Sequence, residues 1–225
     1  MDIQITDFNH AGRVITGKFP RQWEAIASVL QDMSLHLKPS QQKGIEGTPI
    51  FDPVGTNAFM GERLCPRDGW QKVTIPKEYS FLGKDVDFGK DGLLLEVQFS
   101  NYPFLLNNTM RAEILHKARA TLGGQPVTAA VIVTKAKMFP ASNSTLYYEQ
   151  AREQLESLRR LEVFNVPIRL VGLFAPTGED IRISYNTYRG RYSRKIVGKV
   201  VKQCRITPSG ARCEMVVTDL HVENS

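Results

Sequence analysis

The chain has 225 residues, of which 42% are hydrophobic and 23% charged, with a formal net charge of +6 at pH 7. This composition is ordinary for a globular protein with a real core, and the length is large for one domain but short for two. No run approaches the roughly 18 apolar residues of a membrane-spanning helix, and the N-terminus has no leader pattern. The three cysteines form no C-x-x-C pair, which argues against a zinc ribbon and favours free thiols. We therefore expect a cytoplasmic protein with no membrane partner.

The N-terminal third predicts one helix followed by long loops. Residues 22–37 place apolar side chains at helical spacing, with Pro20 near the start. Between residues 38 and 79, glycines and prolines interrupt every pattern, so we expect loops there with a short helix at 57–64. Loops of this length are usually functional or mobile.

The middle of the chain alternates between strand and helix patterns. Apolar runs predict strands at 93–99, 127–134 and 167–174. Between them, helical spacing predicts helices at 104–122 and 146–161. This order indicates an α/β core in which a parallel or mixed sheet is flanked by helices.

The C-terminal region is β-rich and basic. Residues 181–220 alternate as hairpins do. From residue 181 to 213 the chain has no acidic residue, three tyrosines and nine basic residues: Arg182, Arg189, Arg191, Arg194, Lys195, Lys199, Lys202, Arg205 and Arg212. Such a block is typical of a nucleic-acid surface, although a solvated basic sheet face is the alternative. We expect a single domain over 1–225, mainly α/β at 1–178, with a β-rich DNA-binding subdomain at 179–225.

The most informative local motif contains two acidic residues and a glutamine. Asp87 lies in a turn before an apolar strand that carries Glu96 and Gln98. Strand alternation sends Glu96 and Gln98 to one face, while Leu95 and Val97 pack on the other. A carboxylate among apolar neighbours is costly to bury without a metal or a donor. Asp87 and Glu96 converging on one point would form an oxygen site of the kind that Mg²⁺ uses with phosphate substrates.

This arrangement is close to a common nuclease pattern, in which an Asp precedes Glu-x-Lys. Here Gln98 replaces the lysine, so it can orient a water by hydrogen bonds but cannot supply positive charge. Asp85 and Asp91 compete with Asp87 for the first acidic position, since acid-rich turns are usually solvated. An edge-strand salt bridge is the plain alternative for Glu96.

Longer segments carry a specific resemblance. They are Phe51-Asp-Pro-Val-Gly-Thr-Asn57, Leu95-Glu-Val-Gln-Phe-Ser-Asn-Tyr-Pro-Phe-Leu-Leu-Asn-Asn-Thr109, Phe139-Pro-Ala-Ser-Asn-Ser144, Leu146-Tyr-Tyr-Glu-Gln150, Val166-Pro-Ile-Arg-Leu-Val-Gly-Leu173 and Arg191-Tyr-Ser-Arg194. With these segments the chain resembles the BglII family of restriction endonucleases, from the N-terminus to about Lys195. The resemblance implies a PD-(D/E)XK restriction-endonuclease-like core with a mixed central sheet, flanking helices and a C-terminal β-rich subdomain.

The resemblance also implies an activity. It implies a homodimeric type II endonuclease that needs Mg²⁺ and no organic cofactor. The expected substrate is duplex DNA with a palindromic GATC core, cut to leave 5′-GATC overhangs. The carried-over catalytic set is Asp87, Glu96 and Gln98, with Asp87, Glu96 and the Val97 carbonyl on the metal. Lys72 departs from the family pattern, which has an asparagine there, so the resemblance does not extend to the behaviour of the loop that precedes the active site.

The same resemblance assigns DNA contacts, each with a plainer alternative. The implied contacts are Ser100, Asn101, Arg111, Asn143, Ser144, Tyr192 and Arg194. Asn143 and Ser144 could instead cap the following helix, and Arg111 could form a surface salt bridge. Tyr192 and Arg194 could be ordinary phosphate contacts. A DNA-binding protein without cleavage activity is the alternative function, and a small-phosphate hydrolase leaves the basic block without a role.

Overall fold

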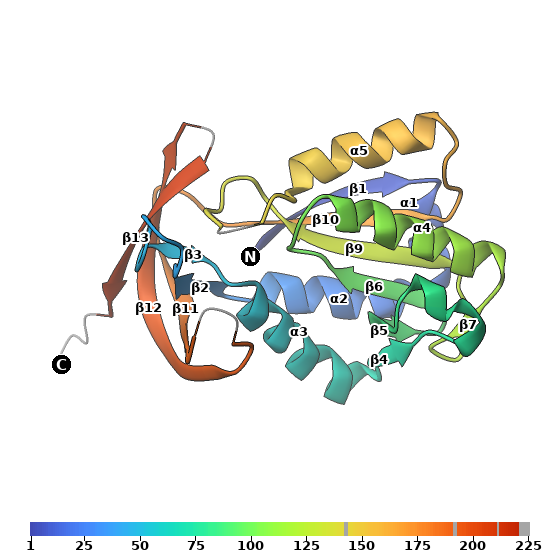
Figure 1. Cartoon of the computed structure of the whole chain (residues 1–225), viewed down its shortest axis with the longest axis horizontal. Helices are drawn as coiled ribbons and strands as arrows, with labels where there is room; N and C mark the ends of the chain where they lie inside the picture. The colour runs from blue at the N-terminus through green and yellow to red at the C-terminus, as the bar shows by residue number, and fades with distance from the viewer. Residues whose placement is uncertain (142–143, 191–192, 211, 221–225) are drawn as a thin grey trace.

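The computed structural model describes residues 1–141, 144–190, 193–210 and 212–220, with the backbone alone at 66–68. Figure 1 shows a large sheet with helices on both faces and a second, mostly antiparallel sheet at one end. The helices are α1 (Ala11–Lys18), α2 (Pro20–Asp32), α3 (Pro53–Asp68), the 3₁₀ helix η1 (Lys77–Leu82), α4 (Pro103–Lys117) and α5 (Tyr148–Arg160). No helix of the described residues is long and apolar enough to cross a membrane.

The large sheet has the strand order β1-β10-β9-β6-β5-β4. Its strands are β1 (Asp2–Phe8), β4 (Gln71–Thr74), β5 (Asp85–Lys90), β6 (Leu93–Val97), β9 (Ala129–Lys135) and β10 (Ile168–Phe174). The central β6, β9 and β10 run parallel, while β1, β5 and β4 pair antiparallel outside them. The predicted mixed sheet is confirmed.

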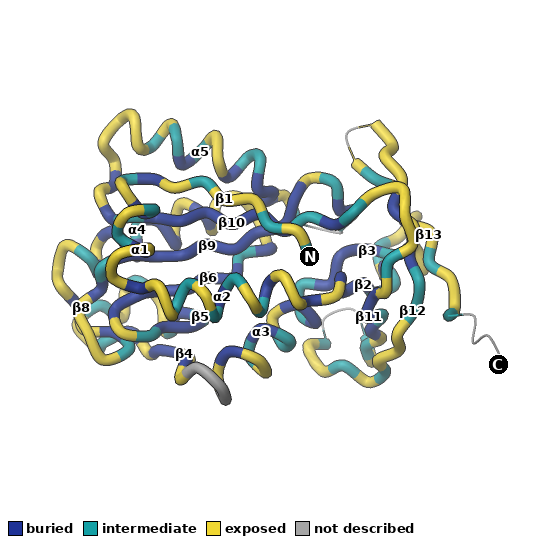
Figure 2. The backbone as a smooth tube through the Cα atoms, turned by 180° about the vertical axis from the view of Figure 1, so that it is seen from behind, coloured by how far each residue is buried: buried dark blue, intermediate teal, exposed yellow. Residues whose placement is uncertain are grey.

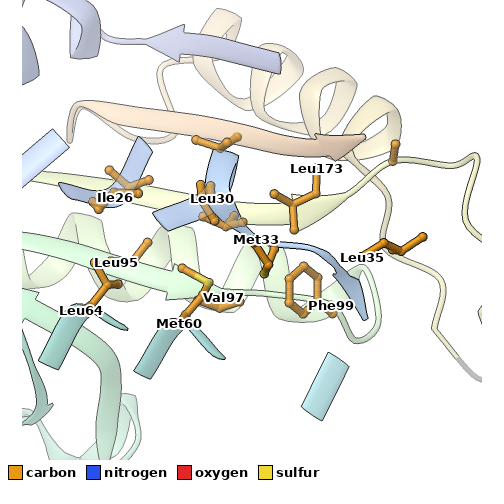
Figure 3. Close-up of a cluster of buried hydrophobic side chains, with 14 of the residues drawn as sticks. Ile26, Leu30, Met33, Leu35, Met60, Leu64, Leu95, Val97, Phe99 and Leu173 are labelled. Atoms are coloured by element: carbon orange, nitrogen blue, oxygen red, sulfur yellow. The ribbon is translucent and has the colours of Figure 1, made fainter. Parts of the chain in front are cut away.

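Strand alternation divides the core into two layers. Leu95, Val131 and Leu173 point to the side of α1, α2 and α3, whereas Leu94 and Ile132 point to the side of α4 and α5. Figure 3 shows the first layer, in which side chains of α2 and α3 meet those of β6. The middle strands β9 and β10 are buried along nearly their whole length, as Figure 2 shows. Burial on both faces explains why apolar residues dominate both strands. The exception in β10, Arg169, is paired with Asp7.

The second sheet has the order β13-β12-β11-β2-β3, and a small hairpin pairs β7 with β8. The strands are β2 (Leu35–Pro39), β3 (Pro49–Phe51), β7 (Thr121–Leu122), β8 (Gln125–Pro126), β11 (Asp180–Tyr188), β12 (Ile196–Ser209) and β13 (Arg212–Asp219). The expected C-terminal hairpins are present. The sheet also takes β2 and β3 from the N-terminal part, because β2 pairs in parallel with β11. The proposed division at residue 178 did not anticipate this crossing.

Two sequence predictions were wrong in the N-terminal third. The helix at 22–37 ends at Asp32, where Met33 is extended (φ −71°, ψ 127°), and Leu37 belongs to β2. The short helix at 57–64 is the sixteen-residue α3. Asp52 caps it by accepting a hydrogen bond from the Val54 N–H (3.2 Å), with proline at its first position.

Candidate active site

The acidic pair lies on neighbouring antiparallel strands of the large sheet. Phe88 of β5 is opposite Leu95 of β6, so Asp87 and Glu96 come next to each other in the ladder. The Asp87 carboxylate accepts a hydrogen bond from the Val97 N–H (Oδ2 to N, 2.9 Å). This bond fixes the carboxylate beside the strand that carries Glu96.

Glu96 is a buried carboxylate with only 7% of its surface exposed. Burial raises the pKa of Glu96 to about 7, the Arg111 guanidinium opposes this rise, and the negative charge of Asp87 adds to it. Arg111 of α4 donates to Glu96 and to the backbone carbonyl of Asp85 (3.3 Å). Because Asp87 and Glu96 are neighbours in the ladder, their negative charges repel each other, and a divalent cation would relieve this repulsion.

The donor set fits Mg²⁺ in its chemistry. The Asp87 carboxylate bonds to the Val97 backbone, and Glu96 is the residue before Val97, so two carboxylates and one backbone carbonyl are available as hard oxygen ligands in the same cleft. No cluster of three or more His, Cys, Asp or Glu side chains with metal-binding geometry occurs among the described residues. A cation here would therefore complete its shell with carbonyl, water or substrate oxygens, as Mg²⁺ usually does.

Gln98 continues the site along the same face of β6. Its Oε1 accepts from Asn108 Nδ2 (2.9 Å), and its Nε2 donates to the Ser100 hydroxyl. Asn108 in turn accepts from Arg111 (Oδ1 to Nη2, 2.9 Å). The chain of contacts Glu96–Arg111–Asn108–Gln98 thus orients Glu96 of β6 and Gln98, the residue directly after that strand. The sequence analysis missed Asn108, although its spacing from Arg111 puts both on one face of α4.

The competing acids are placed differently. Asp85 borders the same cleft, but its carboxylate is paired with Lys72 (2.8 Å), and this pair lowers the pKa of Asp85. Asp91 lies in the β5–β6 turn, where it accepts from Gln22 Nε2 (2.7 Å). Lys72, the departure from the family pattern, therefore contacts the edge of the site.

Asp87 and Glu96 line a cleft of about 590 Å³. Its lining residues are Pro53, Val54, Asn57, Asp85, Asp87, Glu96, Val97, Gln98, Phe99, Ser100, Asn108, Arg111, Ser144 and Arg194. The structure thus brings four implied DNA contacts, Ser100, Arg111, Ser144 and Arg194, to the implied catalytic set. Asn101 is exposed beside this lining and accepts from Thr145 (3.3 Å). Asn143 and Tyr192 lie outside the described residues.

One wall of the cleft depends on a buried carboxylate that the sequence analysis also missed. Asp52 is fully buried and accepts from Asn186 (Nδ2 to Oδ2, 2.8 Å) and the Tyr188 hydroxyl (2.6 Å). These bonds tie the start of α3, which carries Pro53 and Val54, to the end of β11. The nearby His36 is buried, and burial lowers its pKa to about 4.

Comparison with known proteins agrees with this geometry. The family model for restriction endonuclease BglII/BglIII matches residues 3–173. The chain belongs to this family. The type II restriction enzyme BglII of Bacillus subtilis is 50% identical over 208 residues, which are 89% of this chain and 92% of that protein.

Two solved structures are also similar to the chain. The crystal structure of BglII complexed with a DNA 16-mer has a TM-score of 0.92 at 46% identity, and it covers 97% of this chain and 100% of its own. The crystal structure of free BglII has a TM-score of 0.76 at 45% identity over the same shares. Membership of the BglII/BglIII family makes the chain a site-specific endonuclease.

Proposed function

We propose that this endonuclease hydrolyses duplex DNA phosphodiesters with Mg²⁺ at a palindrome that has a GATC core, leaving 5′-GATC overhangs. One observation carries the proposal: a single cleft holds the acidic pair together with Ser100, Ser144 and Arg194. Family membership supports it, because BglII is the relative whose solved structure holds DNA. The proposed DNA contacts also include Asn101, Asn143 and Tyr192, and the proposed location is the cytoplasm.

The residues of the site divide the chemistry. Asp87, Glu96 and the Val97 carbonyl would hold the cation, which when bound neutralises charge on the scissile phosphate and acidifies a water. Gln98 uses one N–H toward Ser100, and its amide carries a second N–H that can orient the attacking water. Arg111 keeps Glu96 in place and brings a positive charge to the cleft, where a phosphate would lie.

We also propose a homodimer, because a palindrome needs two sites related by a two-fold axis. Apolar side chains are exposed on and beside α4 and α5, among them Phe104 (51%) and Leu161 (75%). Leu106, Leu158 and Leu161 line a hollow of about 330 Å³ between these helices. An apolar face of this kind is typical of a protein interface, and a second copy would cover it.

Cleavage mapping tests the proposal. Purified protein is incubated with a sequenced plasmid and Mg²⁺, and the product ends are sequenced. Discrete fragments that begin with 5′-GATC at every end are the expected result. Ends without that overhang, or intact DNA that is merely retarded in a gel, would overturn the assignment.

Sedimentation of the wild type and of Leu106→Glu tests the dimer, since a charge in the apolar face should shift the protein toward monomer.

A further inference from the structure

A lysine is buried at the end of β9, behind the cleft lining formed by Phe99, Ser100 and Ser144. The side chain of Lys135 is fully buried, with 0% of the residue exposed. An ammonium group in such a place is costly unless every donor is satisfied. None of the roles assigned above uses Lys135, so the reason for its position has to lie in its contacts.

Those contacts use all three donors of the ammonium group. Lys135 Nζ donates to the Ser144 hydroxyl (2.5 Å), the Leu146 carbonyl (2.8 Å) and the Phe99 carbonyl (3.3 Å). It also lies 4.4 Å from the centre of the Tyr147 ring, where a cation–π interaction is favourable. A neutral amide side chain has at most two N–H donors, so it could not make all three bonds at once.

The three acceptors belong to two separate segments. Phe99 begins the segment 99–101, which leaves the catalytic strand, and Ser144 and Leu146 belong to the segment 144–147, which leads into α5. Both segments carry implied base contacts. They also touch directly, since the Leu146 N–H donates to the Ser100 carbonyl (3.1 Å) and the Ser144 hydroxyl contacts the Phe99 carbonyl, with the Ser100 carbonyl as its second possible acceptor (3.0 Å). Lys135 lies beneath this junction and bonds to both sides.

Burying a charged lysine in this environment is energetically unfavourable. Its hydrogen-bond partners within the described residues are all neutral oxygens. Burial, and to a lesser degree the positive charge of Arg212, lowers the pKa of Lys135 to about 7. An apolar residue of similar volume would fill this space at no desolvation cost. The compensating benefit is the fixed spacing of two backbone segments, which an apolar residue cannot provide.

We propose that Lys135 is a positioning residue for DNA recognition: it holds segments 99–101 and 144–147 at one spacing, so that both meet the same base pairs together. The proposal rests on the proposed function, because it concerns how that cleft reads its site. Each good base contact discriminates by about 1–3 kcal/mol, and only when donor and acceptor are in register. Loss of the spacing should therefore reduce discrimination rather than folding.

The first test compares two neutral substitutions on β9. Lys135→Met removes the three donors, whereas Thr134→Val removes a buried hydroxyl that has no hydrogen-bond partner among the described residues. The value of kcat/KM is measured on the mapped site and on duplexes with one symmetric base-pair change. For Lys135→Met the ratio of the two values should fall at least about tenfold. Thr134→Val should keep the wild-type ratio.

The second test needs no DNA. Hydrogen exchange should be at least about tenfold faster in Lys135→Met at the amides of Tyr102 and Leu146, which bond across the junction. Amides of β10 should keep their wild-type protection. If Lys135→Met does not fold, Lys135→Gln, which retains two N–H donors without the charge, supplies both measurements.

The outcomes separate this proposal from the proposed function. An unchanged specificity ratio, or exchange that rises equally throughout β9 and β10, would show that Lys135 has only a structural role and would overturn the proposal. A wild-type protein that cuts no duplex at all overturns the proposed function itself, and the recognition role with it. Failure of the proposed function is therefore detected with the wild-type protein alone, before any variant is compared.

Discussion

Two aspartates at the same cleft are held in different ways. Asp87 is half-buried, and the hydrogen bond shown for its carboxylate comes from the Val97 backbone. Asp52 is fully buried and accepts from a backbone amide, an asparagine and a tyrosine. The Asp87 carboxylate belongs to a residue that lines the cleft, while both oxygens of Asp52 accept hydrogen bonds from neighbouring groups. One aspartate is placed for chemistry, and the other holds the α3 wall to β11.

The largest expected effect comes from Asp87→Asn. The amide oxygen can still accept from Val97, but the charge that would hold the cation is lost. We expect cleavage to fall by about 10³-fold or more, with DNA binding and the unfolding midpoint close to wild type. Single-turnover cleavage and a gel-shift assay measure the two properties on one preparation. Wild-type cleavage by this variant would remove Asp87 from the site.

The same chemical change at Asp52 should act on stability instead. In Asp52→Asn an NH₂ group faces the donors of Asn186 and Tyr188, so buried donors lose their acceptor. We expect a loss of about 3 kcal/mol in the free energy of unfolding, measured with urea. Asp180→Asn is the matched control, since Asp180 makes an exposed pair with Arg205 and should change the midpoint little. Equal midpoints for the two variants would contradict the structural role of Asp52.

The pH dependence of cleavage tests the catalytic role of Glu96. Glu96 must be ionised to hold a cation, and its pKa is raised to about 7. At low, fixed Mg²⁺ the rate should therefore fall by about tenfold per pH unit below pH 7. Higher Mg²⁺ competes with the proton and should move this limb to lower pH. Arg111→Gln removes a charge that lowers the pKa of Glu96, so its limb should move to higher pH.

The raised pKa of Glu96 has the opposite effect on stability: it favours the folded protein at low pH, where cleavage is slow. Because the pKa of Glu96 is higher in the folded than in the unfolded protein, Glu96 favours folding at low pH. This contribution is lost as the pH rises from 4.5 through about 7. A cleavage profile that stays flat between pH 6 and 8 at low Mg²⁺ would contradict a catalytic role for this carboxylate.

The smallest effect is expected at Lys72, where the chain departs from its family pattern. Lys72 is two-thirds exposed (67%), and its pair with Asp85 lies at the cleft edge. Exposed pairs contribute little, so Lys72→Asn should change the cleavage rate by less than about twofold and leave the unfolding midpoint unchanged. A larger change in rate would show that this edge of the cleft takes part in the reaction.

Local patterns in the sequence predicted the three central strands of the large sheet, β6, β9 and β10, and the closeness of Asp87 to Glu96. They did not predict β1, β4 or β5, and Asp87 lies on β5 rather than in the expected turn. Asp87, Glu96 and Gln98 lie within one hairpin, and burial on both faces gives β9 and β10 their apolar runs. Leu37 was assigned to a helix because its spacing continues that of α2. Its true partner, Tyr185 of β11, is far along the chain, and no local pattern encodes such a pairing.

The missed polar residues share a cause. Asp52 and Lys135 look like surface charges in a sequence, because burial is decided by segments that come together only in the fold. Asp52 meets Asn186 and Tyr188, and Lys135 meets Phe99 and Leu146. The identity of a charged residue therefore does not predict its burial, because the partners that satisfy it when buried lie elsewhere in the chain.

The parallel pairing of β2 with β11 has a consequence for synthesis. β2 begins at Leu35, yet its partner ends at Tyr188, so the ribosome must make most of the protein before this pairing can form. Closing so long a loop is also slow. A nascent chain would carry the acidic hairpin well before Arg194 and β11 complete the opposite wall. The complete cleft can therefore form only after most of the polypeptide has been made.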